Sequence, residues 1–79
     1  MKITAYLKTH CPWCIELKEF FIKNNIHFEE KNVNKNPEYM DEMIKISNQS
    51  KAPTIIIDDK VYSDVGVEDV KRILTSLKL

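Results

Sequence analysis

The chain has 79 residues, and its 12 basic and 12 acidic side chains balance, which gives no general attraction to nucleic acid or to a membrane surface. A hydrophobic fraction of 43% excludes a disordered chain and suits one globular domain over residues 1–79. No apolar run approaches the ~18 residues of a membrane span, and the first residues lack the apolar stretch of a signal peptide, so we expect a cytoplasmic protein without nucleic-acid or membrane partners.

The first half of the chain predicts a strand, a helix and a second strand. Residues 3–7 alternate partly between apolar and polar types and favour a strand, which stops at a loop that holds both cysteines. Pro12 suits the first position of a helix with Cys11 as its cap, and apolar side chains then recur at helical spacing to about Lys23. Two asparagines end this helix, and residues 27–33 predict the second strand.

The second half predicts a helix, a hairpin and a last helix. Asn36-Pro37 is again a cap followed by proline, and one face of the helix that follows carries Met40, Met43, Ile44 and Ser47. The β-branched run at 54–57 predicts a buried strand, and a tight turn leads to a short strand at 61–63. Gly66 precedes the last helix. The apolar face of that helix consists of Val67, Val70, Ile73, Leu74 and Leu77.

The predicted order of elements is therefore β-α-β-α-β-β-α. The first two strands, joined by a helix, should run parallel with a right-handed crossover. The last two strands should form an antiparallel hairpin. This order predicts an α/β fold with a four-stranded mixed sheet flanked by helices.

Both cysteines of the chain, Cys11 and Cys14, lie at the predicted start of the first helix. Free N–H groups and the helix dipole favour an anion at such a position, so a thiolate at Cys11 is stabilised, and Lys8 adds positive charge nearby. Cys14 lies one turn further into the helix and should be more buried and closer to an ordinary thiol. This asymmetry predicts that Cys11 attacks a disulfide and that Cys14 resolves the mixed disulfide.

The cysteine pair allows three other interpretations. Zinc needs four ligands, and beyond the pair this chain offers only His10 and His27, so no metal site is expected. A structural disulfide is disfavoured because the cytosol is reducing and because so short a loop constrains the unfolded chain very little. An inert buried pair fits poorly with Pro12, which fixes the cysteines at a helix start rather than in the middle of the core.

The segment Tyr6-Leu7-Lys8-Thr9-His10-Cys11-Pro12-Trp13-Cys14 resembles the active-site segment of glutaredoxins, which have the thioredoxin fold. Lys51-Ala52-Pro53 lies where that family has Thr-Val-Pro, and residues 64–69 lie where it has a Gly-Gly turn and an acidic helix start. The resemblance covers nearly the whole chain. It implies a compact dithiol glutaredoxin of the bacterial type, which reduces protein disulfides and glutathione mixed disulfides.

Glutathione would then be the reducing co-substrate, with no bound cofactor, and we expect a monomer. The resemblance implies that Pro53 follows a cis peptide bond, which would turn the backbone of Ala52 toward Cys11 so that it pairs with glutathione or a peptide. The alternative is a trans proline that ends a loop. Lys8 should hold a glutathione carboxylate and support the thiolate, whereas its alternative is a solvated lysine at a strand end.

Three further residues complete the implied site. Trp13 should offer a flat apolar surface beside the sulfurs, and its alternative is a core anchor for the first helix. Asp69 should meet the γ-glutamyl ammonium, and its alternative is an acid that stabilises the helix dipole. The backbone of Val67 should hold the γ-glutamyl carboxylate.

Departures from the glutaredoxin pattern leave two other functions open. Only Gly66 remains of the usual glycine pair, and Met40 stands where the family often has Arg or Gln for the glycyl carboxylate. These departures favour a small redoxin that is recharged by thioredoxin reductase and donates electrons to ribonucleotide reductase, whereas the Cys-Pro-Trp-Cys motif and Lys8 argue against it because they look more like glutaredoxin. The third possibility is a non-enzymatic module that binds an iron–sulfur cluster through Cys11 and glutathione, although Pro12 and the nearby Cys14 argue against it.

Overall fold

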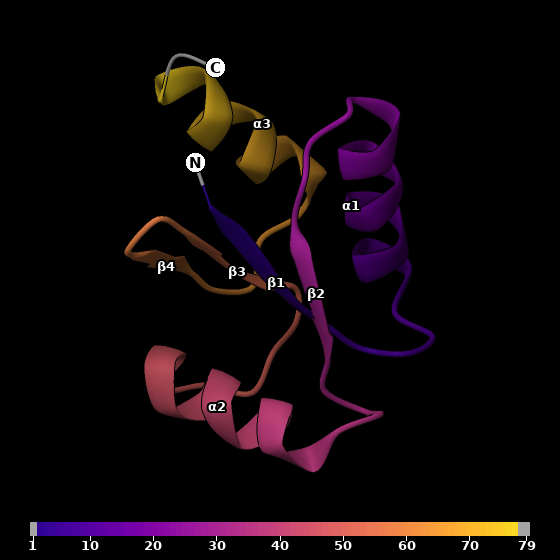
Figure 1. The fold of residues 1–79 in the computed structure, drawn as a ribbon, viewed down its shortest axis with the longest axis vertical. Coiled ribbons are helices and arrows are strands. Elements are labelled where there is room, and N and C mark those ends of the chain that lie inside the picture. Colours follow the sequence, from indigo (N-terminus) through magenta and orange to yellow (C-terminus); the bar gives the residue numbers. More distant parts are fainter. Residues whose placement is uncertain (1, 78–79) are drawn as a thin grey trace.

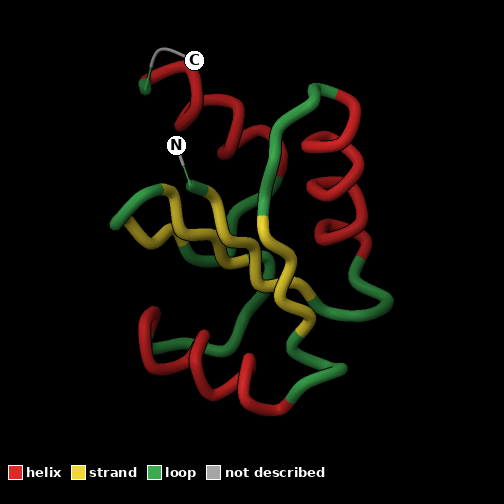
Figure 2. Tube along the Cα trace, viewed as in Figure 1, coloured by secondary structure: helices red, strands yellow, loops and turns green. Residues whose placement is uncertain are grey.

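Seven elements build one mixed sheet with helices on both faces, as the computed structural model of residues 2–77 shows (Figures 1 and 2). They are β1 (Ile3–Leu7), α1 (Pro12–Lys23), β2 (Glu29–Asn32), α2 (Pro37–Ser47), β3 (Thr54–Ile57), β4 (Lys60–Tyr62) and α3 (Val67–Ser76). The helices α1 and α3 lie on one face of the sheet, and α2 lies on the other. The predicted order of elements and the α/β class are confirmed.

The sheet has the strand order β2-β1-β3-β4. β1 runs parallel to β2 and antiparallel to β3, and β3 and β4 form the expected antiparallel hairpin. β2 is shorter than the predicted residues 27–33, because its pairing with β1 runs only from Thr4 opposite Glu29 to Leu7 opposite Asn32. β4 begins one residue earlier than predicted, where Lys60 pairs with Ile57 across the turn.

Proline and a capping side chain start two of the helices. Pro12 and Pro37 occupy the first helical turn of α1 and α2, where a missing backbone donor costs nothing. Asn36 caps α2, because its Oδ1 accepts a hydrogen bond from the Glu38 N–H at 3.0 Å. The starts of α1 and α2 are therefore fixed locally, as the sequence predicts.

The larger core cluster fills the space between the sheet and the helices α1 and α3. Side chains alternate along β1, so Ala5 points into this cluster while Tyr6 points to α2. The buried members of the larger cluster are Ile3, Ala5, Leu7, Cys14, Leu17, Phe21, Ile55, Ile57, Val65, Val70 and Leu74. Cys14 is thus packed in the core, one turn from the start of α1.

Polar side chains help to join α2 to the sheet. Met43 is buried on the predicted apolar face of α2, but Ile44 is exposed, so the face is narrower than predicted. Glu42 accepts a hydrogen bond from the buried Tyr6 hydroxyl and pairs with Lys31 Nζ at 2.5 Å. The pKa of Glu42 is lowered by these bonds, the one from Lys31 first.

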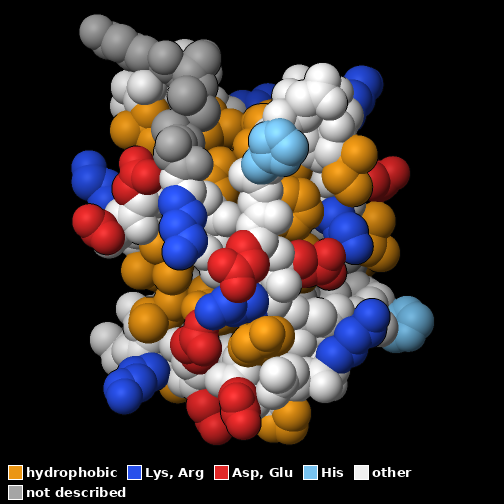
Figure 3. Space-filling model, in the orientation of Figure 1, with side chains coloured by type: hydrophobic (Ala, Val, Ile, Leu, Met, Phe, Trp, Pro, Cys, Tyr) orange, Lys and Arg blue, Asp and Glu red, His pale blue; other side chains and the backbone are white. Residues whose placement is uncertain are grey.

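The outer surface mixes charges of both signs. On the face in Figure 3, basic and acidic side chains are interspersed, with apolar side chains scattered among them. None of the three helices within residues 2–77 is long and apolar enough to cross a membrane.

Candidate active site

The two cysteines occupy the positions that the sequence predicts at the start of α1. Cys11 is the N-cap, and its Sγ accepts a hydrogen bond from the Cys14 N–H at 3.3 Å. Both side chains are free thiols. Cys11 is half-buried, whereas Cys14 is only 2% exposed. The outer sulfur is therefore the one that a partner disulfide can reach.

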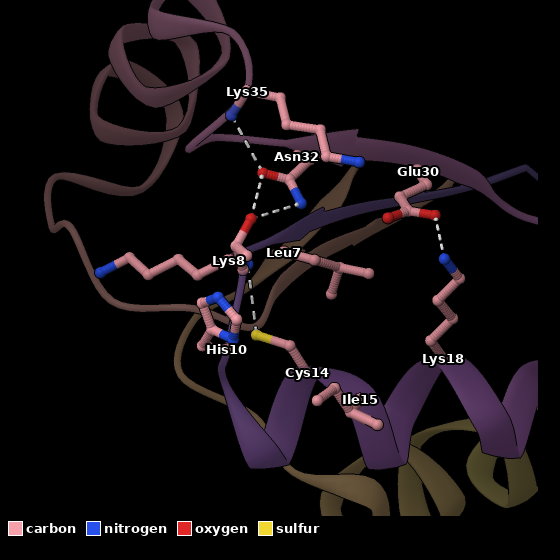
Figure 4. A pocket seen from close by; sticks show the side chains of 10 residues that line it. Leu7, Lys8, His10, Cys14, Ile15, Lys18, Glu30, Asn32 and Lys35 are labelled. Carbon is pink, nitrogen blue, oxygen red and sulfur yellow. Dashed lines mark hydrogen bonds and ion pairs between the residues drawn. The ribbon is translucent and has the colours of Figure 1, made fainter.

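Burial governs the chemistry of Cys14. Burial first, and the hydrogen bond with Cys11 second, raise the pKa of this thiol from 9.0 to about 12. One contact acts the other way: the Lys8 backbone N–H donates a hydrogen bond to Cys14 Sγ at 3.4 Å (Figure 4). At neutral pH Cys14 is a protonated thiol.

A cavity of about 190 Å³ lies on the β2 side of Cys14 (Figure 4). Lys18 in its wall pairs with Glu30 at 2.9 Å. Its lining consists of Leu7, Lys8, Thr9, His10, Cys14, Ile15, Lys18, Glu30, Asn32 and Lys35. Of the predicted site residues, only Lys8 and Cys14 line it.

The proline loop has the predicted cis peptide bond. The Ala52–Pro53 peptide bond is cis, and Pro53 is buried. The Pro53 carbonyl accepts a hydrogen bond from the Val65 N–H at 3.0 Å, which ties this loop to the segment before α3. Cys11, Ala52 and Val67 all pack against the larger core cluster. The structure thus brings three of the predicted residues to the border of the same cluster.

Asp69 acts first as a capping residue of α3. Its Oδ2 accepts a hydrogen bond from the Gly66 N–H at 3.0 Å, and its Oδ1 accepts one from Arg72 at 2.5 Å. The Gly66 bond, followed by the Arg72 bond, lowers the pKa of Asp69. The alternative interpretation of Asp69 as a helix-start acid is confirmed, and contact with an ammonium group stays a prediction.

Trp13 and Lys8 differ in how their side chains are placed. Trp13 is 62% exposed, so its interpretation as a core anchor is wrong, and its ring is free to meet a partner. The Lys8 side chain extends away from Cys14 in Figure 4, and only its backbone contacts that sulfur.

Within residues 2–77, no three His, Cys, Asp or Glu side chains form a group that could hold a metal ion.

Two residues of this region were missed by sequence reasoning. Asn32 and Asn34 contact Thr9, in the loop that leads to Cys11. A signal for them exists, because β1 and β2 are parallel and their carboxyl ends meet at one edge of the sheet. The loops that follow the two strands must therefore be neighbours.

Comparison with known proteins identifies the family. Residues 3–62 match the family model of glutaredoxin. The glutaredoxin-like protein NrdH of Lactococcus lactis is 31% identical over 90% of this chain and 97% of that protein. Among solved structures, the thioredoxin-like protein BC3987 has a TM-score of 0.82 at 30% identity, covering 92% of this chain and 100% of that one.

A second solved structure, the glutaredoxin-like NrdH-redoxin from Escherichia coli, has a TM-score of 0.74 at 26% identity, with 92% of this chain and 95% of that one covered. Its description refers to a thioredoxin-like activity profile. The fold of residues 2–77 agrees with these matches. The chain belongs to the glutaredoxin family and has the thioredoxin fold.

Proposed function

We propose that this chain reduces disulfide bonds in other proteins by dithiol exchange through Cys11 and Cys14. Glutaredoxin-family membership implies thiol-disulfide oxidoreductase activity in general. The observation that carries the proposal is the inequality of the two thiols. The Cys14 backbone N–H donates a hydrogen bond to Cys11 Sγ, yet the Cys11 thiol borders the surface and the Cys14 thiol is buried.

In the first step, the Cys11 thiolate attacks one sulfur of the substrate disulfide. A bond forms between that sulfur and Cys11 Sγ, the substrate S–S bond breaks, and the other substrate sulfur leaves as a thiolate that takes up a proton. The N-cap position supports this step, because the Cys14 N–H donates to Cys11 Sγ and a helix start favours negative charge.

In the second step, Cys14 loses its proton and attacks Cys11 Sγ. The bond between Cys11 and the substrate breaks, the substrate sulfur leaves as a thiolate that takes up a proton, the Cys11–Cys14 disulfide forms, and two electrons have moved to the substrate. Once Cys11 is in the mixed disulfide, its free thiol no longer helps to raise the pKa of Cys14. Cys14 therefore becomes a better nucleophile only after Cys11 has reacted.

Thioredoxin reductase is the reductant that we propose for the resulting disulfide, with ribonucleotide reductase as an acceptor of the electrons. Similarity to the L. lactis NrdH over 97% of its length supports this choice, as does the thioredoxin-like profile ascribed to the E. coli NrdH-redoxin.

Glutathione is the second candidate reductant. The cis bond before Pro53 and the position of Ala52 and Val67 against the same core cluster as Cys11 favour it. In that case the backbones of Ala52 and Val67, together with Lys8 and Asp69, would hold the tripeptide. Mixed disulfides of glutathione would then be substrates alongside protein disulfides.

The test follows NADPH consumption during the reduction of a protein disulfide such as insulin. One arm contains thioredoxin reductase, and the other contains glutathione with glutathione reductase. Turnover with thioredoxin reductase alone supports the proposed reductant, whereas turnover with glutathione alone overturns it and leaves dithiol exchange intact. Cys11→Ser should abolish the reaction in both arms.

The matched variant Cys14→Ser separates the roles of the two thiols. It should form the mixed disulfide with the protein substrate but fail to release it, so the covalent complex should accumulate and turnover should stop. Full turnover by Cys14→Ser would refute the two-cysteine mechanism.

A further inference from the structure

The loop before Cys11 is held by side chains from the loop after β2. Asn34 Oδ1 accepts a hydrogen bond from the Thr9 backbone N–H at 2.6 Å. The Thr9 hydroxyl and the Asn32 side-chain amide are hydrogen-bonded at 3.3 Å. Asn32 Oδ1 in turn accepts the backbone N–H groups of Asn34 and Lys35 at 2.9 and 3.1 Å. Asn32 thus organises the loop that presents Asn34.

Hydrogen bonds fix two consecutive peptide groups next to Cys14. In the peptide group that joins Leu7 to Lys8, the Leu7 carbonyl accepts a hydrogen bond from the Val33 N–H at 2.9 Å, and the Lys8 N–H donates one to Cys14 Sγ at 3.4 Å. The second peptide group joins Lys8 to Thr9, and its N–H is the one that Asn34 binds. The direction of the Lys8 amide is therefore held from both sides.

We propose that Asn34, supported by Asn32, is a positioning residue that keeps the Lys8 amide on Cys14 Sγ and thereby sets the equilibrium between the dithiol and the disulfide. The sulfur of the protonated Cys14 thiol is a better acceptor of an N–H bond than a disulfide sulfur, because a bonded second sulfur withdraws more electron density than a hydrogen does. The hydrogen bond from Asn34 Oδ1 to the Thr9 N–H, which holds the Lys8 amide on Cys14 Sγ, therefore favours the dithiol form of the protein. The proposal needs only that Cys11 and Cys14 form a disulfide, as the proposed function also requires.

The experiment equilibrates the full chain with mixtures of reduced and oxidised dithiothreitol. The protein disulfide takes two electrons and two protons from reduced dithiothreitol, which becomes its cyclic disulfide, while Cys11 and Cys14 become thiols. Alkylation and mass measurement give the two protein forms. This equilibrium involves neither a substrate protein nor a reductase, so it stands or falls separately from the proposed reductant.

Asn34→Ala should move the equilibrium constant about threefold toward the disulfide, because the constant changes by the difference between the strengths of the Lys8–Cys14 bond in the two forms, which is only part of one hydrogen bond. Asn34→Asp keeps an acceptor oxygen, and at high salt, where its added charge is screened, it should return most of the way to the wild-type value. Asn24→Ala is the matched control, because it removes the side-chain bond from Asn24 to the Phe20 carbonyl at the far end of α1. It should leave the constant unchanged.

A merely structural role predicts a different pattern. Loss of a structural bond destabilises the reduced and oxidised forms equally and leaves their equilibrium unchanged. A wild-type constant in Asn34→Ala, an equal shift in Asn24→Ala, or no recovery in Asn34→Asp would each overturn the proposal. If Asn34→Ala does not fold, Thr9→Ala removes only the bond to Asn32 and should give a smaller shift in the same direction, and no shift would overturn the proposal.

Discussion

The contrast between the two thiols can be tested by removing Cys11. In Cys11→Ser, Cys14 is the sole cysteine of the chain. The shift of its pKa from 9.0 to about 12 in the native protein corresponds to about a thousandfold smaller thiolate fraction at pH 8. Burial is the largest cause of that shift and persists in the variant, whereas the contributions of Cys11 are reduced. We therefore expect alkylation much slower than for an ordinary thiol, with about a thousandfold as the upper limit.

The assay measures the rate of iodoacetamide addition by mass spectrometry between pH 6 and pH 10. The same variant unfolded in urea supplies the rate for an ordinary thiol, and folded Cys14→Ser reports on Cys11. The folded Cys14 rate should lie far below both and should keep rising at pH 10, because the thiol has not finished ionising. A folded Cys14 that reacts as fast as the unfolded one would refute the assignment of burial as the controlling cause.

Three further measurements test other parts of the molecule. Tyr6→Phe removes the hydroxyl that donates to Glu42, so the free energy of unfolding should fall by about 1 kcal/mol and the melting temperature by about 4–8 °C. Calorimetry should show a smaller change for Tyr62→Phe, whose hydroxyl makes no hydrogen bond within residues 2–77, and equal changes would contradict the role of the Glu42 bond. Because the pKa of Cys14 is raised in the folded protein, this thiol ionises at a lower pH in the unfolded chain than in the folded one. The free energy of unfolding, measured by urea denaturation, should therefore fall as pH rises from about 9 toward 12. A free energy of unfolding that stays constant over this range would contradict the raised pKa. Trp13→Ala should change the free energy of unfolding by less than about 0.5 kcal/mol because the ring is exposed, but it should lower kcat/KM for protein disulfides, and unchanged kinetics would remove Trp13 from the partner surface.

Local signals made much of the fold and part of the site predictable. A cap residue followed by proline, at Pro12 and at Pro37, predicts the start of a helix, because proline is favoured at the first helical position and disfavoured further inside a helix. The placement of Cys11 at a helix cap and the burial of Cys14 one turn later follow from the same signal. The cis bond before Pro53 came only from the family resemblance, since a cis proline has no local signature of its own.

Contacts between residues far apart in the sequence were not predictable in the same way. The Asn34–Thr9 bond joins residues 25 positions apart, and the Tyr6–Glu42 bond joins residues 36 positions apart. Neither depends on periodicity or on a cap. Asn34 reads as an ordinary loop residue until the neighbouring ends of β1 and β2 bring its loop against the cysteine loop.

The two edge strands of the sheet, β2 and β4, affect how readily the protein aggregates at high concentration. β2 holds Glu29, Glu30 and Lys31, and two of these side chains are anchored by ion pairs, Glu30 to Lys18 and Lys31 to Glu42. β4 is only three residues long and begins with a lysine. The charged side chains of β2 and the short length of β4 both disfavour the pairing of a strand from a second molecule with the edges of this sheet. The architecture thus protects against edge-to-edge aggregation while the cysteine loop stays open to partners.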